Sequence, residues 1–498
     1  MKWGAISTVA RFGLQLIAQV VMARILGPET YGLFGMGLVV YTLCMFLANF
    51  GLGWSLIQKN DLHDEDIRFA MTWQVIAGLI GTAALYFGAP WIAAYFREPR
   101  VESVISWLSL ACVISAAASP TNNLLQRDLN FRATGAIQVG SYAVGYLLVG
   151  IPVALHYKSV YALVAAWLTQ ATVTLIASFC VRPHPLKPLF WYAGAKDMLN
   201  TGGTVFYTNV CNWLLNNLDR LLIGRLLNAH AVGVYTAGYN LANMPNTLLL
   251  GALQPAFLSA GARLQEEPGR LKRAYVEVVS TVFVLITPAF ALLAYLAPDL
   301  IGVLYGDKWG DAAPVLTILF AAMPAYVLWG LSTPILWNTG RKSYEALLQV
   351  PVLIAAAGAF YLWAADGVTA AAAVAAAVLA ARAGIISTAA CRALGITLPE
   401  LSQQVMRAAI GCAVVVAGAY LARTLFASLV QAPAFLQHLG ALTAATAGAL
   451  LAATAMVAAR PQALGPQAWR MLDRFIPGLS HRRSRLASTA ADTAKEEQ

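Results

Sequence analysis

Apolar runs of about 20 residues follow one another along most of this chain, and each is long enough to cross a bilayer as a helix. Hydrophobic residues make up 59% of the 498 residues and charged residues only 11%, whereas ordinary soluble domains carry about 25% charged residues. The sequence therefore predicts an all-α membrane protein and excludes a soluble enzyme, a disordered chain and a secreted disulfide scaffold. The formal charge of +10 is typical of basic cytoplasmic loops, so no nucleic-acid partner is expected.

We predict about fourteen membrane spans, each one an apolar run between more polar segments. They lie at 3–24, 34–57, 69–88, 103–124, 134–155, 160–181, 201–226, 233–258, 276–296, 313–337, 344–364, 367–390, 405–428 and 434–458. Most of the 33 Lys and Arg residues fall on one side of these spans, and Arg382, Arg392 and Arg407 are counted on that side. Because basic loops stay in the cytoplasm, both termini are expected to be cytoplasmic.

The first twelve spans carry an internal repeat. Residues 23–34 match residues 224–235 at an offset of 201, and Ile137-Gln138-Val139 resembles Leu348-Gln349-Val350 further on. Because six spans separate the copies, both have the same orientation, which predicts two parallel six-helix lobes around a central cavity with two peripheral helices. The expected parts are an N-lobe at 1–181, a cytoplasmic linker at 182–200, a C-lobe at 201–390, helices 13 and 14 at 405–458, and a basic cytoplasmic tail at 459–498.

Polar residues inside two of the spans form stripes at helical spacing. The first stripe is Arg11, Gln15 and Gln19, and the second is Asn212, Asn216 and Arg220 with Asp219 beside it. The stripes are equivalent in the repeat, because adding 201 to each member of the first gives the second. Polar residues in spans face protein or water, so we predict that all seven line a substrate-binding cavity. Two simpler interpretations stay open: the amides bridge helices, and Arg220 reaches the outer interface.

No pattern typical of covalent chemistry is present. The sequence has no nucleotide-binding Gly-rich loop with Lys and Ser/Thr, no HExxH and no Cys/His cluster, so no catalytic residue, metal or cofactor is predicted. Tyr326, Trp329 and Trp337 could stack on sugars, although packing or an interfacial aromatic belt accounts for each of them.

Several short motifs, in this order, resemble those of Wzx-type polysaccharide flippases of the MOP superfamily. They are Lys2-Trp3 with Ser7-Thr8, the turn Ala23-Arg24-Ile25-Leu26-Gly27-Pro28 with Tyr31-Gly32, Asp219-Arg220-Leu221-Leu222-Ile223-Gly224, Tyr305-Gly306-Asp307-Lys308-Trp309, and Gly340-Arg341. The resemblance covers roughly residues 1–400. It implies that the chain flips an undecaprenyl-diphosphate-linked oligosaccharide across the bacterial inner membrane, by alternating access of two lobes, for capsule, O-antigen or exopolysaccharide synthesis. It also implies membrane lipids as partners, coupling to an ion of unknown identity, and other polysaccharide assembly proteins as candidate partners.

Two alternatives remain at this point. A cation-coupled multidrug exporter of the same superfamily would share the topology, but its cavity should carry acids, and Asp219 is the one candidate inside a span away from its ends. A membrane-embedded polysaccharide assembly enzyme would need a catalytic aqueous loop. A flipping assay run beside a drug-efflux assay separates these functions.

Overall fold

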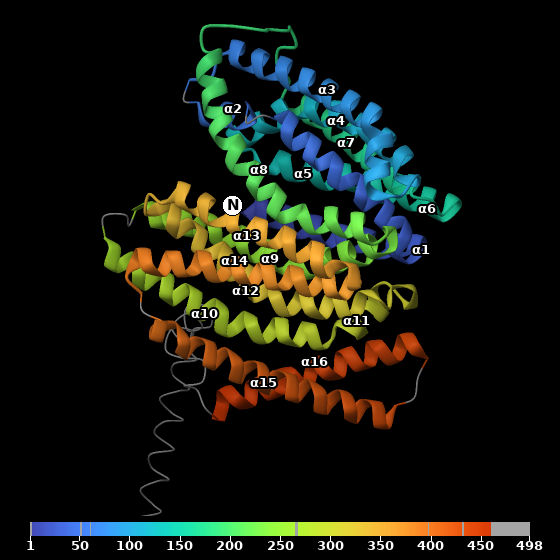
Figure 1. Cartoon of the computed structure of the whole chain (residues 1–498), viewed down its shortest axis with the longest axis vertical. Helices are drawn as coiled ribbons and strands as arrows, with labels where there is room; N and C mark the ends of the chain where they lie inside the picture. Colours follow the sequence, from blue (N-terminus) through green and yellow to red (C-terminus); the bar gives the residue numbers. More distant parts are fainter. Residues whose placement is uncertain are drawn as a thin grey trace, which may run out of the picture. The chain divides into compact units, whose positions relative to one another are not determined.

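The computed structural model describes residues 2–49, 52–59, 61–263, 267–396, 398–430 and 433–459, and in these ranges all regular structure is helical (Figure 1). The predicted tail lies outside the described residues from position 460 on. The elements are α1 Lys2–Asn49, α2 Leu52–Gln58, α3 Asp64–Phe96, α4 Arg100–Arg127, α5 Phe131–Tyr142, the π-helix η1 Ala143–Gly150, α6 Ile151–Tyr157, α7 Tyr161–Val181, α8 Ala195–Leu226, α9 Ala229–Arg263, α10 Pro268–Tyr295, α11 Ala297–Leu304, the 3₁₀ turn η2 Asp307–Trp309, α12 Ala312–Asn338, α13 Lys342–Trp363, the 3₁₀ turn η3 Ala364–Asp366, α14 Val368–Leu394, α15 Leu398–Leu429 and α16 Ala434–Ala459.

The all-α membrane fold predicted from the sequence is confirmed. Within the described residues, 11 helices are long and apolar enough to cross a membrane. One of them, Val9–Phe46, is 38 residues long and covers parts of two predicted spans. The predicted spans 201–226 and 233–258 fall in α8 and α9. The number fourteen and the two-lobe layout stay predictions.

A kink divides α1 into two parts. Gly27 has a φ of 77°, a backbone conformation that glycine adopts at no steric cost, and Pro28 follows it inside the helix. Proline has no N–H to give to the preceding turn and disrupts a helix at its own position. The predicted loop between the spans 3–24 and 34–57 is therefore a sharp bend in one helix, and the end of the second span forms the separate short helix α2.

One compact unit comprises the residues up to Ala237 together with 304–309 and 353–374. In it α3 packs along α4, and α4 packs against α7 and α1. Its core contains Met22, Phe34, Leu108 and Leu163. Part of the linker predicted at 182–200 lies along α3, where Arg68 Nε and Trp73 Nε1 donate to the carbonyl oxygens of Lys187 and Phe190 at 2.9 and 3.0 Å. The end of the predicted linker, from Ala195 on, is instead the beginning of α8.

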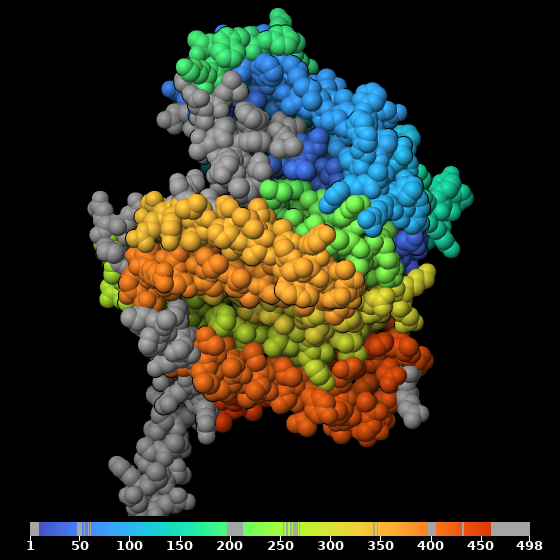
Figure 2. Space-filling model, viewed as in Figure 1, coloured from blue at the N-terminus to red at the C-terminus, as the bar shows by residue number. Residues whose placement is uncertain are grey.

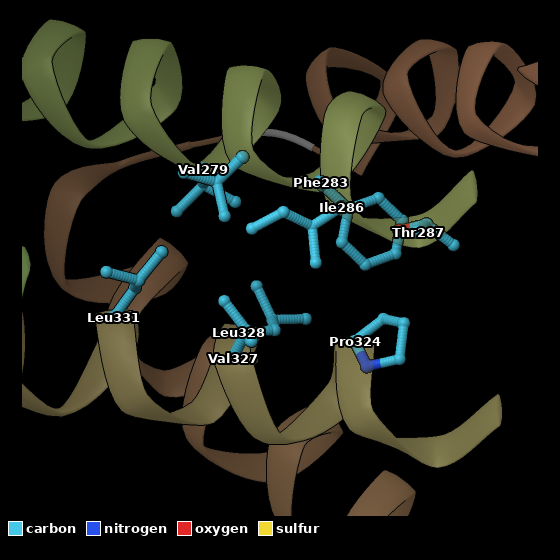
Figure 3. Close-up of a pocket in the computed structure, with 9 residues that line it drawn as sticks. Val279, Phe283, Ile286, Thr287, Pro324, Val327, Leu328 and Leu331 are labelled. Atoms are coloured by element: carbon cyan, nitrogen blue, oxygen red, sulfur yellow. The ribbon is translucent and has the colours of Figure 1, made fainter. Parts of the chain in front are cut away.

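A second unit comprises 238–303, 310–352 and the residues from Ala375 on. Here α10 packs against α12 and α15, and α15 packs along α16, where a side chain on either Gly418 or Gly448 would overlap the backbone of the other. Between α10 and α12 lies an apolar cavity of about 10 Å³, lined by residues that include Phe283 and Leu331 (Figure 3). A space of this size holds about one water molecule, so it is no substrate site.

An ionic cluster attaches the two C-terminal helices to α11. Asp299, which is 1% exposed, lies 3.0 Å from Arg423 Nη2 on α15 and 2.9 Å from His438 Nδ1 on α16. A buried carboxylate is costly unless it has charged or hydrogen-bonding partners. The predicted peripheral helices are thus held by a buried acid in addition to apolar packing.

Candidate functional site

Arg11 lies half-buried on α1, in the first unit. Its Nη1 donates a hydrogen bond to Oε1 of Gln138 on α5 at 2.7 Å. Tyr142, one turn beyond Gln138, lies within electrostatic reach of the guanidinium and stacks on Tyr146 with ring centroids 4.4 Å apart. Among the residues that the structure describes, no carboxylate pairs with Arg11. A guanidinium has five N–H donors, so Arg11 keeps its charge and most of its donors for a further partner.

The other two members of the α1 stripe, Gln15 and Gln19, differ in their hydrogen bonding. Gln15 is half-buried and makes no hydrogen bond within the described part of the chain. Gln19 Nε2 donates to the hydroxyl of Tyr305 at 2.7 Å, and the hydroxyl of Tyr31 donates to the main-chain oxygen of Gln19 at 3.2 Å. The stripe therefore has a polar side chain with open hydrogen-bonding groups, Gln15, between Arg11 and Gln19, whose side-chain amide already donates to Tyr305.

Residues 304–309 are attached to α1 by side chains from both segments. Trp309 is fully buried, and its Nε1 donates to the carbonyl oxygen of Ala23 at 3.1 Å. Arg24 Nε donates to the carbonyl oxygen of Leu304 at 2.8 Å. The motif Tyr305-Gly306-Asp307-Lys308-Trp309 thus holds the end of the first α1 segment in place, just before its kink.

Repeat-equivalent residues of α1 and α9 meet in a reciprocal contact. A side chain on Gly32 would overlap the carbonyl oxygen of Ala229, and a side chain on Gly233 would overlap the carbonyl oxygen of Pro28. At the offset of 201 residues, Gly233 is the counterpart of Gly32 and Ala229 is the counterpart of Pro28. The Gly32–Gly233 contact is what two segments related by a two-fold axis make, and it supports the internal repeat.

Replacing Gly32 with alanine is expected to lower the free energy of unfolding. Overpacking a close contact costs about 1–3 kcal/mol, which outweighs the gain of up to about 1 kcal/mol from alanine in a helix. Gly13→Ala is the matched control on the same helix, because among the described residues no atom beyond the adjoining helix backbone lies within 4 Å of its added carbon. Thermal unfolding in detergent should show a lower midpoint for Gly32→Ala only. Equal midpoints for the two variants would contradict the close contact.

The second predicted stripe lies on α8. Asp219 is buried; its Oδ2 accepts a hydrogen bond from the hydroxyl of Tyr235 at 2.6 Å, and its Oδ1 accepts from the main-chain N–H of Arg220 at 2.8 Å. Nη1 of Arg220 lies 3.4 Å from the carbonyl oxygen of Asn216 and 3.3 Å from Oδ1 of Asn217. The side chain of Asn212 lies outside the described residues.

The two stripes are on helices that touch, since α1 packs against α8 within the first unit. The hydrogen bonds of the α1 stripe include those to Gln138 and Tyr305, and those of the α8 stripe include bonds to Tyr235 and within α8 itself. That the stripes face each other across a cavity stays a prediction.

A buried polar cluster in the second unit was missed by the sequence analysis. Arg382 on α14 is 2% exposed, and its Nη2 donates to Oε1 of Gln349 on α13 at 2.6 Å. Gln349 Nε2 donates to Oε1 of Glu345 at 3.1 Å. Glu345 also accepts from Thr333 Oγ1 at 3.1 Å and from Trp337 Nε1 at 2.5 Å. We call these residues the Arg382 cluster.

The placement of Arg382 corrects its assignment to the cytoplasmic loops. The guanidinium lies 3.8 Å from the ring centre of Trp329, so this tryptophan supplies a cation–π contact. The signal that could have found the cluster is the position of Arg382 inside the predicted span 367–390, together with the four-residue spacing of Glu345 and Gln349 on one helix face. An arginine that packs between helices is missed when Lys and Arg residues are simply assigned to the nearest loop.

Arg11 and Arg382 have repeat-equivalent partners. Gln138 and Gln349 occupy matching positions in the repeat, and each accepts a hydrogen bond from an arginine, at 2.7 and 2.6 Å. Arg11 comes from the start of the chain and Arg382 from α14, and only Arg382 has an acid, Glu345, in its hydrogen-bonded cluster. The cluster of the second unit therefore combines an arginine with an acid, whereas no acid pairs with Arg11 among the residues that the structure describes.

The fold defines the class of the protein. It is similar to that of the lipid II flippase MurJ in an inward closed conformation, with a TM-score of 0.70 at 12% identity, covering 92% of this chain and 99% of that one. It is also similar to an inward-facing multidrug resistance MATE family transporter of the MOP superfamily, with a TM-score of 0.62 at 15% identity, covering 77% of this chain and 94% of that one. The chain therefore has the all-helical fold shared by these membrane proteins.

Sequence similarity identifies the family to which the protein belongs. Residues 21–314, more than half of the chain, match the model of a family described as polysaccharide biosynthesis protein, and the chain belongs to this family. A relative is the lipopolysaccharide biosynthesis protein WzxC of Escherichia coli K12, which is 27% identical over 323 residues. That alignment covers 64% of this chain and 65% of WzxC, slightly less than two thirds of its length.

Proposed function

We propose that this protein flips a lipid-diphosphate-linked oligosaccharide across the bacterial inner membrane for the synthesis of a surface polysaccharide. The observation that carries the proposal is Arg11, a guanidinium inside a membrane span whose described hydrogen bond goes to the neutral amide of Gln138. An arginine in a span is costly without a partner or water. A diphosphate suits it, because the planar guanidinium can donate two parallel hydrogen bonds to phosphate oxygens.

The mechanism that we propose is alternating access. In this proposal, the Gly32–Gly233 contact and the bonds from Arg24 and Arg225 to the carbonyl oxygens of Leu304 and Tyr95 close one end of the transport path. Arg11 lies about 24 Å of helix away from the kink at Gly27, at 1.5 Å per residue. Opening and closing this end would alternate the side from which the stripes are reached. The lobes 1–181 and 201–390 are the moving parts of the proposal, with both termini in the cytoplasm.

A cation-coupled drug exporter is the weaker alternative. Its cavity would need an available acid, and the buried carboxylate of Asp219 already accepts hydrogen bonds at both oxygens. The fold likeness to a drug transporter concerns architecture alone. A membrane-embedded assembly enzyme is the other alternative, and it predicts bond formation or cleavage that a transport assay with chemically stable lipid can detect.

The function is tested with purified protein in liposomes that contain a fluorescent polyprenyl-diphosphate oligosaccharide. A membrane-impermeant quencher reports which lipids have moved to the inner leaflet. We expect flipping of this lipid, with no change in its mass, and no transport of cationic drugs in a parallel efflux assay. Drug transport without flipping would favour the exporter, and a change in the lipid's mass would favour the enzyme.

A further inference from the structure

The second unit contains an open groove that the proposed transport path does not use. It lies between the beginning of α13 and the end of α14 and has a volume of about 710 Å³, within the range of about 300–1,000 Å³ that is usual for ligand sites. Figure 2 shows the two helices as neighbouring yellow-orange and orange bands on the visible face. The groove is lined chiefly by Arg341, Tyr344, Leu348, Ile385, Thr388 and Arg392.

The groove has two arginines with free guanidinium groups. Within the described part of the chain, neither Arg341 nor Arg392 makes a side-chain hydrogen bond or an ion pair, and both are exposed. Their backbones are nevertheless held in place. Arg341 follows Gly340, whose φ is 74°. The main-chain N–H of Arg341 donates to the carbonyl oxygen of Leu336 at 2.8 Å. Two positively charged side chains therefore extend from ordered backbone on the wall of one groove.

The rest of the lining is mostly apolar with two hydroxyl groups. Tyr344 and Thr388 add hydroxyl groups near the arginines, while Leu348 and Ile385 supply an apolar wall. The apolar surface continues along α13, where the side chain of Leu347 is 66% exposed. Basic pockets between membrane helices near the bilayer surface are suited to anionic lipid headgroups.

We propose that this groove binds a lipid-borne phosphate group, with the phosphate between Arg341 and Arg392 and the lipid chain along Leu348 and Ile385. The proposal does not depend on the function proposed for Arg11. Two lipids share the required chemistry: the polyprenyl diphosphate of a transport substrate, and an anionic phospholipid of the bilayer. The groove lies on the same two helices as the Arg382 cluster, so an occupant would contact the segments that hold Gln349 and Arg382 in position.

The test measures lipid binding to the full-length protein in detergent by native mass spectrometry. The probes are undecaprenyl diphosphate, phosphatidylglycerol, inorganic pyrophosphate and diacylglycerol. The double variant Arg341→Gln with Arg392→Gln should weaken binding of the two phosphate lipids by about tenfold or more, because charge-assisted hydrogen bonds are lost. Arg270→Gln, which also removes an exposed charge from the second unit, should change binding by less than about twofold. Thr388→Trp fills the groove without changing its charge and should also weaken binding, which separates occupancy from general electrostatics.

Each outcome decides the proposal. Preferential loss of undecaprenyl diphosphate identifies the transport lipid as the occupant, and preferential loss of phosphatidylglycerol identifies a bilayer lipid; both support the site. If diacylglycerol bound as tightly as the phosphate lipids, the phosphate would not be recognised. If pyrophosphate bound as tightly as they do, the apolar wall would have no role. Either result would overturn the proposal, as would wild-type binding by both the double variant and Thr388→Trp. If either the double variant or Thr388→Trp elutes as an aggregate, the other variant alone provides the test.

Discussion

Replacing Arg11 with alanine is expected to remove most of the flipping activity while the amount of protein in the membrane stays normal. An arginine inside a span costs about 2.5–3.5 kcal/mol on insertion scales, so removing it should not impair insertion. A hydrogen bond to a charged group contributes about 1.5–3 kcal/mol, which corresponds to roughly a 10- to 100-fold loss of rate or affinity. Flipping in liposomes and membrane abundance are measured together.

Graded variants distinguish charge from geometry at the same position. Arg11→Lys keeps the positive charge but loses the planar fork, so flipping should fall only in part. Arg11→Gln should resemble alanine. Arg220→Ala is the matched control: it removes an arginine of the second stripe that bonds within its own helix, and it should cost less activity. Full flipping by Arg11→Ala at normal abundance would reduce Arg11 to a tolerated structural residue.

Removing one partner from the Arg382 cluster is expected to destabilise the protein by about 3–5 kcal/mol, because it leaves an uncompensated buried charge. Glu345→Leu removes the acid from the cluster around Arg382, and Arg382→Met removes the positive charge from the cluster around Glu345. Denaturant unfolding in mixed micelles gives the free energies. Arg270→Met, an exposed arginine in the same unit, should change stability by less than about 0.5 kcal/mol.

The double variant decides whether the two charges act on each other. Glu345→Leu combined with Arg382→Met should cost less than the sum of the single variants, by about 0.5–3 kcal/mol, since neither charge remains unpaired. Strict additivity would mean that the bridging amide of Gln349 insulates the two groups. A larger loss in the double variant would mean that the cluster contributes mainly through packing.

Most of the fold could be predicted from the sequence because bilayer thickness sets the length of an apolar run independently of tertiary contacts. The predicted span 160–181 coincides almost completely with α7, and 434–458 with α16. Boundaries were wrong where a helix continues past its apolar run: α3 extends from Asp64 to Phe96, well beyond 69–88. The bend at Gly27 was predicted as a loop, because a glycine–proline pair marks a break in direction without stating whether helix resumes at once.

The candidate site was less accessible to sequence reasoning. Helical spacing is enough to place Arg11 and Gln19 on one stripe, but it cannot show that Gln19 is engaged by Tyr305, which is 286 positions away. Arg382 was assigned to a loop for the same reason, since its partner Gln349 comes from another helix. Spacing reports neighbours on one helix, whereas the environment of a buried charge is decided by the helices around it.

The Gly32–Gly233 contact has a thermodynamic consequence for any motion that separates its two sides. Glycine has no side-chain rotamers, and the opposing groups are backbone carbonyls. Forming or breaking the contact therefore neither costs nor releases side-chain conformational entropy, which elsewhere amounts to as much as about 2 kcal/mol for each long side chain that is immobilised. Two backbone surfaces of this kind have no alternative side-chain arrangements. They can therefore separate and re-form the same contact repeatedly.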